Sequence, residues 1–230
     1  ADGTTLFLTH DHTISILPQV VKNPGYDPVH DFVSVGGFAT FVNAFAVSGG
    51  TPAKSFTDYV AWVKAQGKGK GAVGIPAPAS TPEFLVKLVG EKYQIDLVSA
   101  PYRGSAPAFT DLTGGQVQFM AESIPQAANY HKQGEVRALA VTSRERNPAL
   151  PDVPTVIESG IKGFEVVGFY GFLAPAGTPK DVVAKLSDAF RQVLATPDIR
   201  SRMIAQGADP AFLGADEFAK FLAAEMPRWA

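Results

Sequence analysis

The stretch PYRGSAPAFTDLTGGQVQFM, which runs from Pro101 to Met120, has the pattern of a turn followed by a helix and a strand. Ser105 is a residue type that often caps a helix, and Pro107 suits the first turn of one. Gly114-Gly115 is expected to end that helix. The apolar run that follows predicts a strand at Val117–Ala121. The stretch is therefore typical of a strand-to-helix connection in an α/β protein.

Strands and helices continue to alternate on both sides of this stretch. We expect strands at Gly71–Ile75, Ile95–Ala100, Val117–Ala121 and Val136–Thr142. We expect helices at Ser55–Gln66, Thr81–Tyr93, Ser105–Leu112 and Pro125–Lys132, the first opened by a capping box of Ser55 with Asp58. Strand-to-helix steps in this succession favour an open, mostly parallel sheet with helices on both faces.

The two ends of the chain follow a different pattern. Before the alternation we expect a strand at Thr5–Thr9, a short helix ending near Val21, and a β-rich segment at Phe32–Ser48 in which Gly36-Gly37 makes a break or bend. After it we expect a β-like segment at Phe164–Leu173 and helices at Pro179–Ala195, Pro197–Gln206 and Ala215–Trp229.

Length and composition exclude several classes of function. The chain has 230 residues, which is enough for one large domain or two small ones with a buried core. Its formal net charge is −2 and no basic stripe is present, so we expect no nucleic-acid partner. The sequence contains no cysteine, which excludes disulfides, thiolate nucleophiles and cysteine-ligated metals. No apolar run is long enough to cross a membrane.

Two of the predicted strand-to-helix turns are suited to binding an anion. Ligands of open α/β sheets bind beyond the carboxyl ends of the strands, where helix N-termini present unpaired N–H groups. Ser80 or Thr81 is expected to cap one such helix, and Ser105 another, while Gly104 allows a ligand to approach the backbone. Both turns follow predicted strands, so we expect them to face one cleft. The alternative is that these residues only start helices.

The same stretch resembles a family pattern, Y-K-G-[AS]-A-P-A-x-T-D-L-x-G-G-Q-V-D-x-M. The family is that of the Bug-type substrate-binding proteins of tripartite tricarboxylate transporters. Further matches follow in the family's order: DGTTLFL, YDPVHDF, EVRALAVTSRERNPALPDVPTVIESG and GFYGFLAPAGTP. The resemblance covers nearly the whole chain.

The resemblance implies a periplasmic protein of α/β, periplasmic-binding-protein-like fold, with two lobes that close like a Venus flytrap on a small carboxylate. Its implied partner is the membrane permease of a tripartite tricarboxylate transporter. We expect a monomer without cofactor that does not itself span the membrane. Two alternatives stay open: a ligand-binding component of a carboxylate-sensing pathway, and an enzyme acting on a small carboxylate.

The resemblance also implies how the chain divides. Lobe I would comprise residues 1–38 and 164–230, and lobe II residues 39–163. Family members usually carry a further segment before the strand that matches DGTTLFL. Lobe I is therefore expected to be incomplete at its N-terminal side.

The ligand-binding residues implied by the matching positions fall into three groups. The helix starts contribute Ala79, Ser80, Thr81, Tyr102, Gly104, Ser105 and Ala106. The loop after the first strand contributes His10 and Thr13. Tyr170 could stack on or hydrogen-bond a ligand, with packing in the core as the equal alternative. Glu122 stands where the family often has Asp and would favour a ligand with an amino group if it faces the cleft.

Three other motifs would indicate a metal site, a dinucleotide site or a serine nucleophile. His10-Asp11-His12 has alternate residues that could ligate a metal, but two histidines and one aspartate so close together rarely complete a site, and we expect none. The glycine run from Gly67 to Gly74 mimics a dinucleotide fingerprint, yet it ends a helix instead of opening one. No G-x-S-x-G elbow supports a serine nucleophile.

Overall fold

The computed structural model describes residues 1–67, 71–162 and 164–229. The chain divides into two compact units, which are described separately. Unit 1 comprises Ala1–Phe41 and Gly168–Ala230, and unit 2 comprises Val42–Val167. The boundaries lie a few residues after the lobe boundaries expected from the sequence.

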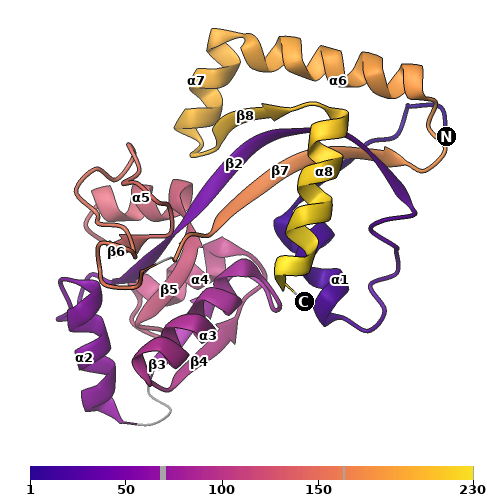
Figure 1. The fold of residues 1–230 in the computed structure, drawn as a ribbon. Helices are drawn as coiled ribbons and strands as arrows, with labels where there is room; N and C mark the ends of the chain where they lie inside the picture. The colour runs from indigo at the N-terminus through magenta and orange to yellow at the C-terminus, as the bar shows by residue number, and fades with distance from the viewer. Residues whose placement is uncertain (68–70, 163, 230) are drawn as a thin grey trace. The chain divides into compact units, whose positions relative to one another are not determined.

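Unit 2 contains the alternating strands and helices. Its strands are the second part of β2 (Phe32–Ser48), β3 (Gly71–Ile75), β4 (Leu97–Pro101), β5 (Phe119–Ser123) and β6 (Val136–Val141) (Figure 1). Its helices are α2 (Phe56–Gln66), α3 (Thr81–Tyr93), α4 (Ser105–Thr113) and α5 (Ile124–Lys132). The predicted alternation is confirmed.

The sheet of unit 2 has the strand order β6-β2-β5-β3-β4. Strand β3 pairs in parallel with β4 and β5, while β2 pairs antiparallel with β5 and β6. The strands β3 to β6 therefore all run in one direction, and only β2 opposes them. Their carboxyl ends meet at a single edge of the sheet, which we call the carboxyl edge of unit 2.

Helices cover both faces of this sheet, as the alternation along β2 requires. Phe45 and Val47 belong to a core with α2 and α3, whereas Ala44 and Ala46 belong to a second core with α4 and α5. In the first core Phe119 stacks between aromatic rings, with its centroid 4.0 Å from that of Tyr59 and 5.3 Å from that of Phe45. A strand buried on both faces reads as a continuous apolar run, which explains the composition of β2.

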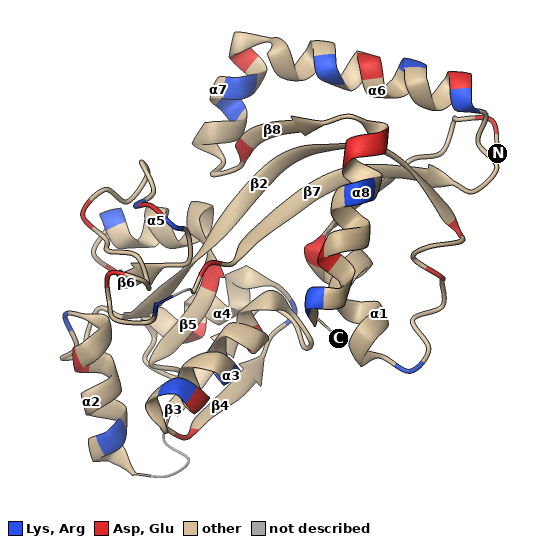
Figure 2. Cartoon of the chain, viewed as in Figure 1, with Lys and Arg blue, Asp and Glu red and all other residues tan. Residues whose placement is uncertain are grey.

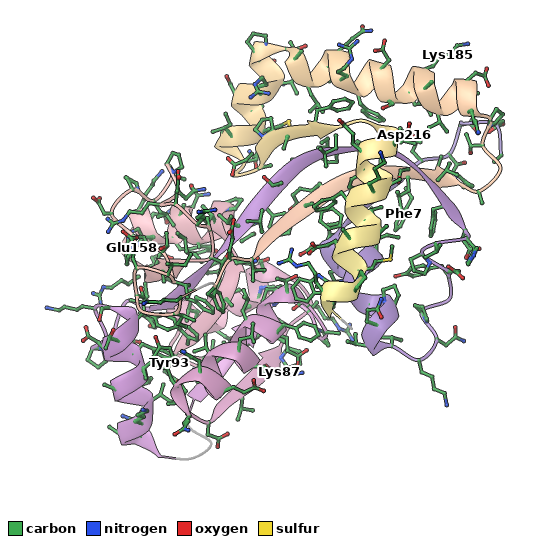
Figure 3. All side chains as sticks on the ribbon, in the orientation of Figure 1. Phe7, Lys87, Tyr93, Glu158, Lys185 and Asp216 are labelled. Carbon is green, nitrogen blue, oxygen red and sulfur yellow. The ribbon has the colours of Figure 1, made fainter. Side chains whose placement is uncertain are left out.

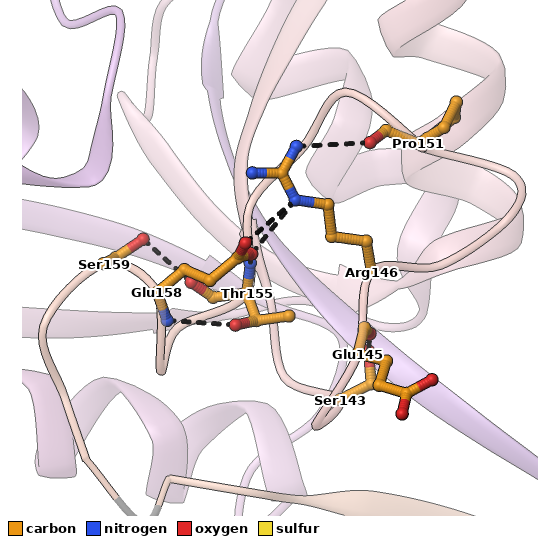
Figure 4. Close-up of polar contacts among 7 residues, drawn as sticks. All are labelled: Ser143, Glu145, Arg146, Pro151, Thr155, Glu158 and Ser159. Carbon is orange, nitrogen blue, oxygen red and sulfur yellow. Dashed lines mark hydrogen bonds and ion pairs between the residues drawn. The ribbon is translucent and has the colours of Figure 1, made fainter.

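The long loop after β6 is organised by one ion pair on the surface (Figure 4). The Arg146 Nε atom lies 3.1 Å from each carboxylate oxygen of Glu158. Glu158 also accepts a hydrogen bond from the Thr155 N–H, and its own N–H donates to the Thr155 hydroxyl. The Arg146 side chain lowers the pKa of Glu158, with the Thr155 N–H as a further cause.

Unit 1 is built from both ends of the chain. It contains β1 (Phe7–His10), a π-helical turn (His12–Ile16), α1 (Leu17–Val20), the first part of β2, and β7 (Val167–Pro175). It continues with α6 (Lys180–Ala195), α7 (Pro197–Ala205), β8 (Asp209–Leu213), α8 (Ala215–Glu225) and a 3-10 turn (Met226–Trp229). The strand order is β1-β7-β2-β8. Basic and acidic residues are interspersed along α6 (Figure 2).

Helix α8 packs on the sheet of unit 1 through Phe218, which is fully buried. A Cβ atom on Gly171 would lie 2.2 Å from Phe218 Cζ, and one on Gly37 would lie 2.9 Å from Phe218 Cδ2. Glycine is therefore needed at both positions so that the aromatic ring can contact the strands. Phe7 stacks on Phe32 and joins the same core (Figure 3).

The structure corrects three expectations for the ends of the chain. Strand β8 was not predicted from the sequence; it pairs antiparallel with β2, and its Pro210 lies opposite Ala39. Gly36-Gly37 does not break β2, which runs without interruption from Phe32 to Ser48; its pairing with β8 shifts register between Gly37 and Ala39. The last helix ends at Glu225 and continues as the 3-10 turn. No helix among the described residues has the length and apolar character needed to cross a bilayer.

Candidate functional site

The carboxyl edge of unit 2 gathers the starts of three helices. Helix α3 follows β3, α4 follows β4 and α5 follows β5, so each begins just beyond the end of a parallel strand. The first N–H groups of a helix have no partner inside the helix and carry the positive end of its dipole. This edge is therefore the part of unit 2 that is most suited to an anion.

The turns before α3 and α4 lie side by side. The Tyr102 N–H donates to the Ile75 carbonyl at 2.9 Å, and the Gly104 N–H donates to the Pro76 carbonyl at 2.9 Å. These two bonds extend the β3–β4 pairing beyond the strands. Both turns therefore lie at the carboxyl edge of unit 2, and the expectation that they face one cleft stays a prediction.

The turn before α3 is held in a strained conformation. Ala79 has a φ of 53°, which is uncommon for a residue with a side chain. Its N–H donates to the Glu83 carboxylate at 2.6 Å. Ser80 occupies the N-cap position, but its hydroxyl donates to the Ala77 carbonyl at 2.6 Å and does not cap the helix. Ser80 and Thr81 are both buried. The expected side-chain cap from Ser80 is thus wrong, because the hydroxyl closes the preceding turn.

The turn before α4 differs from the prediction in its cap. The N-cap residue is Gly104, with a φ of 98°, and Ser105 and Ala106 are the first helical residues. A Cβ atom on Gly104 would meet nothing within 4 Å, so the backbone conformation and not crowding requires glycine there. The expected cap from Ser105 is wrong. The N-cap position has a positive φ, which glycine adopts readily, and Ser105 follows it as the first helical residue.

Tyr102 is fixed by a partner that the sequence did not indicate. Its hydroxyl donates to Asp111 Oδ2 at 2.7 Å. Burial raises the pKa of Tyr102 to about 12, and the hydrogen bond to the Asp111 carboxylate contributes further. The Tyr102 hydroxyl is therefore bonded to a residue of α4, and this bond closes the turn between β4 and α4.

Two buried polar side chains lie on the paired strands β5 and β2, and the sequence analysis selected only one of them. Glu122 was selected as a candidate, and it lies on β5 in a buried position. Asn43 was missed; it faces Ser123 across the β2–β5 pair and is also buried. The signal for Asn43 was a single amide inside the apolar run of β2.

The remaining candidates, His10, Thr13 and Tyr170, belong to unit 1. His10 and Tyr170 are directly opposite on β1 and β7, with ring centroids 6.3 Å apart. Tyr170 also contacts Phe41, at 4.7 Å between centroids. Thr13 lies in the π-helical turn, where its carbonyl accepts a hydrogen bond from the Tyr26 hydroxyl.

The last two motifs are the His10-Asp11-His12 segment and the glycine run that starts at Gly67. His10 Nδ1 lies 3.2 Å from Asp11 Oδ1, so the aspartate of His10-Asp11-His12 is engaged by its own neighbour. Within residues 1–67, 71–162 and 164–229, no cluster of three His, Asp or Glu side chains could hold a metal ion. The Lys-Gly-Lys part of the glycine run, at 68–70, lies outside the described residues.

Comparison with known proteins identifies the family. A family model described as "Tripartite tricarboxylate transporter family receptor" matches residues 1–230. The structure is similar to that of the periplasmic binding protein BugD, with 32% identity and a TM-score of 0.90 over 99% of this chain and 76% of that one.

Two similar structures from Rhodopseudomonas palustris contain small acids. MatC with bound malate has 29% identity and a TM-score of 0.87 over 99% of this chain and 78% of that one. A second protein, solved with adipate, has 28% identity and a TM-score of 0.93 over 99% of this chain and 76% of that one. These likenesses confirm the predicted α/β, periplasmic-binding-protein-like fold.

The chain spans 60 to 62% of the length of the curated relatives that match it at 30 to 33% identity.

Proposed function

The chain belongs to the tripartite tricarboxylate transporter receptor family, and we propose that it acts as a periplasmic receptor for a small carboxylate. In this proposal the protein is not an enzyme: it captures the acid and presents it to the membrane permease of a tripartite tricarboxylate transporter. Malate and adipate in two similar structures support a dicarboxylate or a related acid as the ligand.

The observation that carries the proposal is the paired helix starts at the carboxyl edge of unit 2. The turns before α3 and α4 are joined by the hydrogen bonds of Tyr102 and Gly104 to the end of β3. Neither N-cap residue, Ser80 or Gly104, caps its helix with a side chain. By contrast, the hydroxyl of Ser55 accepts the Asp58 N–H at the start of α2. At the start of α4, where the N-cap is a glycine without a side chain, a ligand carboxylate would supply an acceptor for the helix N–H groups.

A thermal-shift panel of dicarboxylates, citrate, aromatic acids and acidic amino acids, with their esters as controls, tests the proposal. A ligand at 100 times its Kd stabilises the native state by about 2.7 kcal/mol. For a protein of this size the melting temperature then rises by about 5 to 11 °C. An acid that shifts the melt while its ester does not supports the proposal. A panel without any shift would contradict it.

One pair of variants tests the helix start directly. Ser105 is the first residue of α4, a position where proline fits the helix but has no N–H to donate. We expect Ser105→Pro to weaken binding of the acid about 10-fold or more, in line with the loss of one hydrogen bond to a charged group. Ser105→Ala keeps the N–H and should bind as the wild type does. Equal affinity of both variants would refute the assigned role of α4.

A further inference from the structure

The chain passes between its two units twice, from Phe41 to Val42 in β2 and from Val167 to Gly168 in β7. Strands β2 and β7 are neighbours in the sheet order. A hinge between two units is a short piece of chain that absorbs a change of φ and ψ between segments that stay rigid. The contacts that hold the two crossings rigid on each side therefore decide where a hinge can lie.

On the side of unit 2, Thr142 holds both crossings. Thr142 directly follows β6 and is fully buried. Its N–H donates to the Asn43 carbonyl at 2.9 Å, and its hydroxyl accepts from the Asn43 N–H at 3.0 Å. The same hydroxyl donates to the Val166 carbonyl at 2.8 Å, and the Thr142 carbonyl accepts from the Val166 N–H at 3.1 Å. One residue thus forms hydrogen bonds in both directions with each of the two crossing segments.

The hydroxyl of Thr142 is what makes this double attachment possible. Two residues that face each other in a regular antiparallel ladder exchange both N–H···O bonds through their main chains. The register of β2 with β6 pairs Ala44 with Val141, which brings Asn43 opposite Thr142. Here the Asn43 N–H bonds to the Thr142 hydroxyl, and the Thr142 carbonyl is left for Val166. Without the hydroxyl, the Asn43 N–H and the Val166 carbonyl would each lose this partner.

On the side of unit 1, the ring of Phe41 holds the second crossing. A Cβ atom on Gly168 would lie 2.2 Å from Phe41 Cζ, 2.5 Å from Cε1 and 2.6 Å from Cε2, so the ring lies against the main chain of β7. Phe41 is buried, and its ring centroid is 4.7 Å from that of Tyr170. The two crossings are therefore in contact on each side of the boundary, and the residues left between these contacts are Val42 and Val167.

We propose that Thr142 is a positioning residue for the joint between the two units: its hydroxyl ties the crossings together, so that they turn as one at Val42 and Val167. This inference rests on the proposed function, in which the two units close on the acid. Two strands that bend independently allow many open arrangements, whereas two tied strands allow few. A receptor with fewer open arrangements loses less conformational entropy when it closes on a ligand.

Three variants separate this role from a general loss of stability. Thr142→Val keeps the shape of the side chain and removes the hydroxyl, while Thr142→Ser keeps the hydroxyl. Thr178→Val is the matched control, because the Thr178 hydroxyl is also buried and also donates to a carbonyl at 2.8 Å, that of Pro175 at the far end of β7. We expect both valine variants to melt at a lower temperature than the wild type.

Time-resolved energy transfer measures the motion of the units in the ligand-free protein. The sequence has no cysteine, so Lys92→Cys with Lys185→Cys places one dye on α3 of unit 2 and one on α6 of unit 1. Both lysines are exposed. Motions of whole units are slower than a fluorescence decay, which therefore records the distribution of distances between the dyes. We expect Thr142→Val to widen this distribution, and Thr142→Ser and Thr178→Val to leave it as in the wild type.

Hydrogen exchange tests the attachment itself and does not depend on the folding of any variant. In the wild type, the amides of Asn43 and Val166 should exchange as slowly as the interior amides of β2, because both donate to Thr142. In Thr142→Val, the Asn43 amide should exchange about 10-fold faster or more, in line with the loss of one hydrogen bond. Fast exchange of either amide in the wild type would overturn the inference.

Three results of the energy-transfer experiment would also overturn the inference. An unchanged distribution in Thr142→Val would mean that Thr142 only stabilises unit 2. An equal widening in Thr178→Val would trace the effect to lost stability. A wide distribution in Thr142→Ser would show that the hydroxyl does not tie the crossings. None of these readouts needs a ligand, so a thermal-shift panel without any response would refute the proposed function and leave them unchanged.

Discussion

Replacing Gly171 by alanine places a methyl group where the ring of Phe218 already lies. The added Cβ would be 2.2 Å from Phe218 Cζ and 2.4 Å from Phe218 Cε1. Phe218 is fully buried and cannot turn into solvent, so strand β7 or helix α8 must shift. Overpacking of this kind costs about 1 to 3 kcal/mol. We expect the melting temperature to fall by about 2 to 12 °C.

A double-mutant cycle separates this clash from other effects of the substitution. Leucine at position 218 ends before the Cζ and Cε1 positions, so Gly171→Ala should cost markedly less in a Phe218→Leu background, with a coupling of about 1 to 2 kcal/mol. Gly50→Ala is the matched control, because a Cβ there meets nothing within 4 Å. Chemical denaturation monitored by circular dichroism measures all variants. Two results would contradict the close packing of Phe218 against Gly171. One is that Gly171→Ala lowers the free energy of unfolding no more than Gly50→Ala does. The other is that Gly171→Ala lowers it equally with Phe218 and with leucine at position 218.

Three further predictions concern hydrogen bonds of unit 2. Ser55→Ala removes the hydroxyl that accepts the Asp58 N–H, so unfolding should require about 1 kcal/mol less free energy in denaturant titrations. Tyr102 has its pKa raised to about 12, so its stabilising contribution is present below pH 10 and is lost as the pH rises through 12; ultraviolet titration should show a late phenol that Tyr102→Phe removes. Glu158 has its pKa lowered below 4.5, so its contribution is present above that pH and is lost on acidification; wild type and Glu158→Gln should differ in stability at pH 6 and converge at low pH. An unchanged gap between the two proteins at low pH would contradict the Arg146 pairing.

The alternation of strands and helices in unit 2 was predictable because apolar residues recur every three or four positions in a helix, whereas buried strands read as short continuous apolar runs. The ends of the elements were less predictable. The strand expected at Val117–Ala121 begins at Phe119 instead, since the N–H groups of Gln116 and Val117 donate to the Asp111 carbonyl and close the end of α4. The strand therefore begins two residues later than expected and extends to Ser123, so it includes Glu122.

The candidate site was predictable at the level of its turns, but its side-chain partners were not. Sequence spacing places Ser80 and Ser105 near helix starts, yet a backbone conformation decides which residue caps. Gly104 takes the N-cap through its positive φ, and Ser80 turns its hydroxyl to a carbonyl. The burial of Asn43 depends on its pairing with β5, which no local pattern of β2 contains.

The division of the chain has a consequence for the order in which the protein folds. Unit 2 is one continuous segment, Val42–Val167, whereas unit 1 joins Ala1–Phe41 to Gly168–Ala230. Contacts between segments so distant in sequence form slowly, because a long loop must close before they stabilise anything. During synthesis on the ribosome, we expect unit 2 to fold before β7 is available to pair with β1. Pulse-labelled hydrogen exchange during refolding should then protect the amides of β3 and β5 before those of β1, and simultaneous protection would show that the two units fold as one.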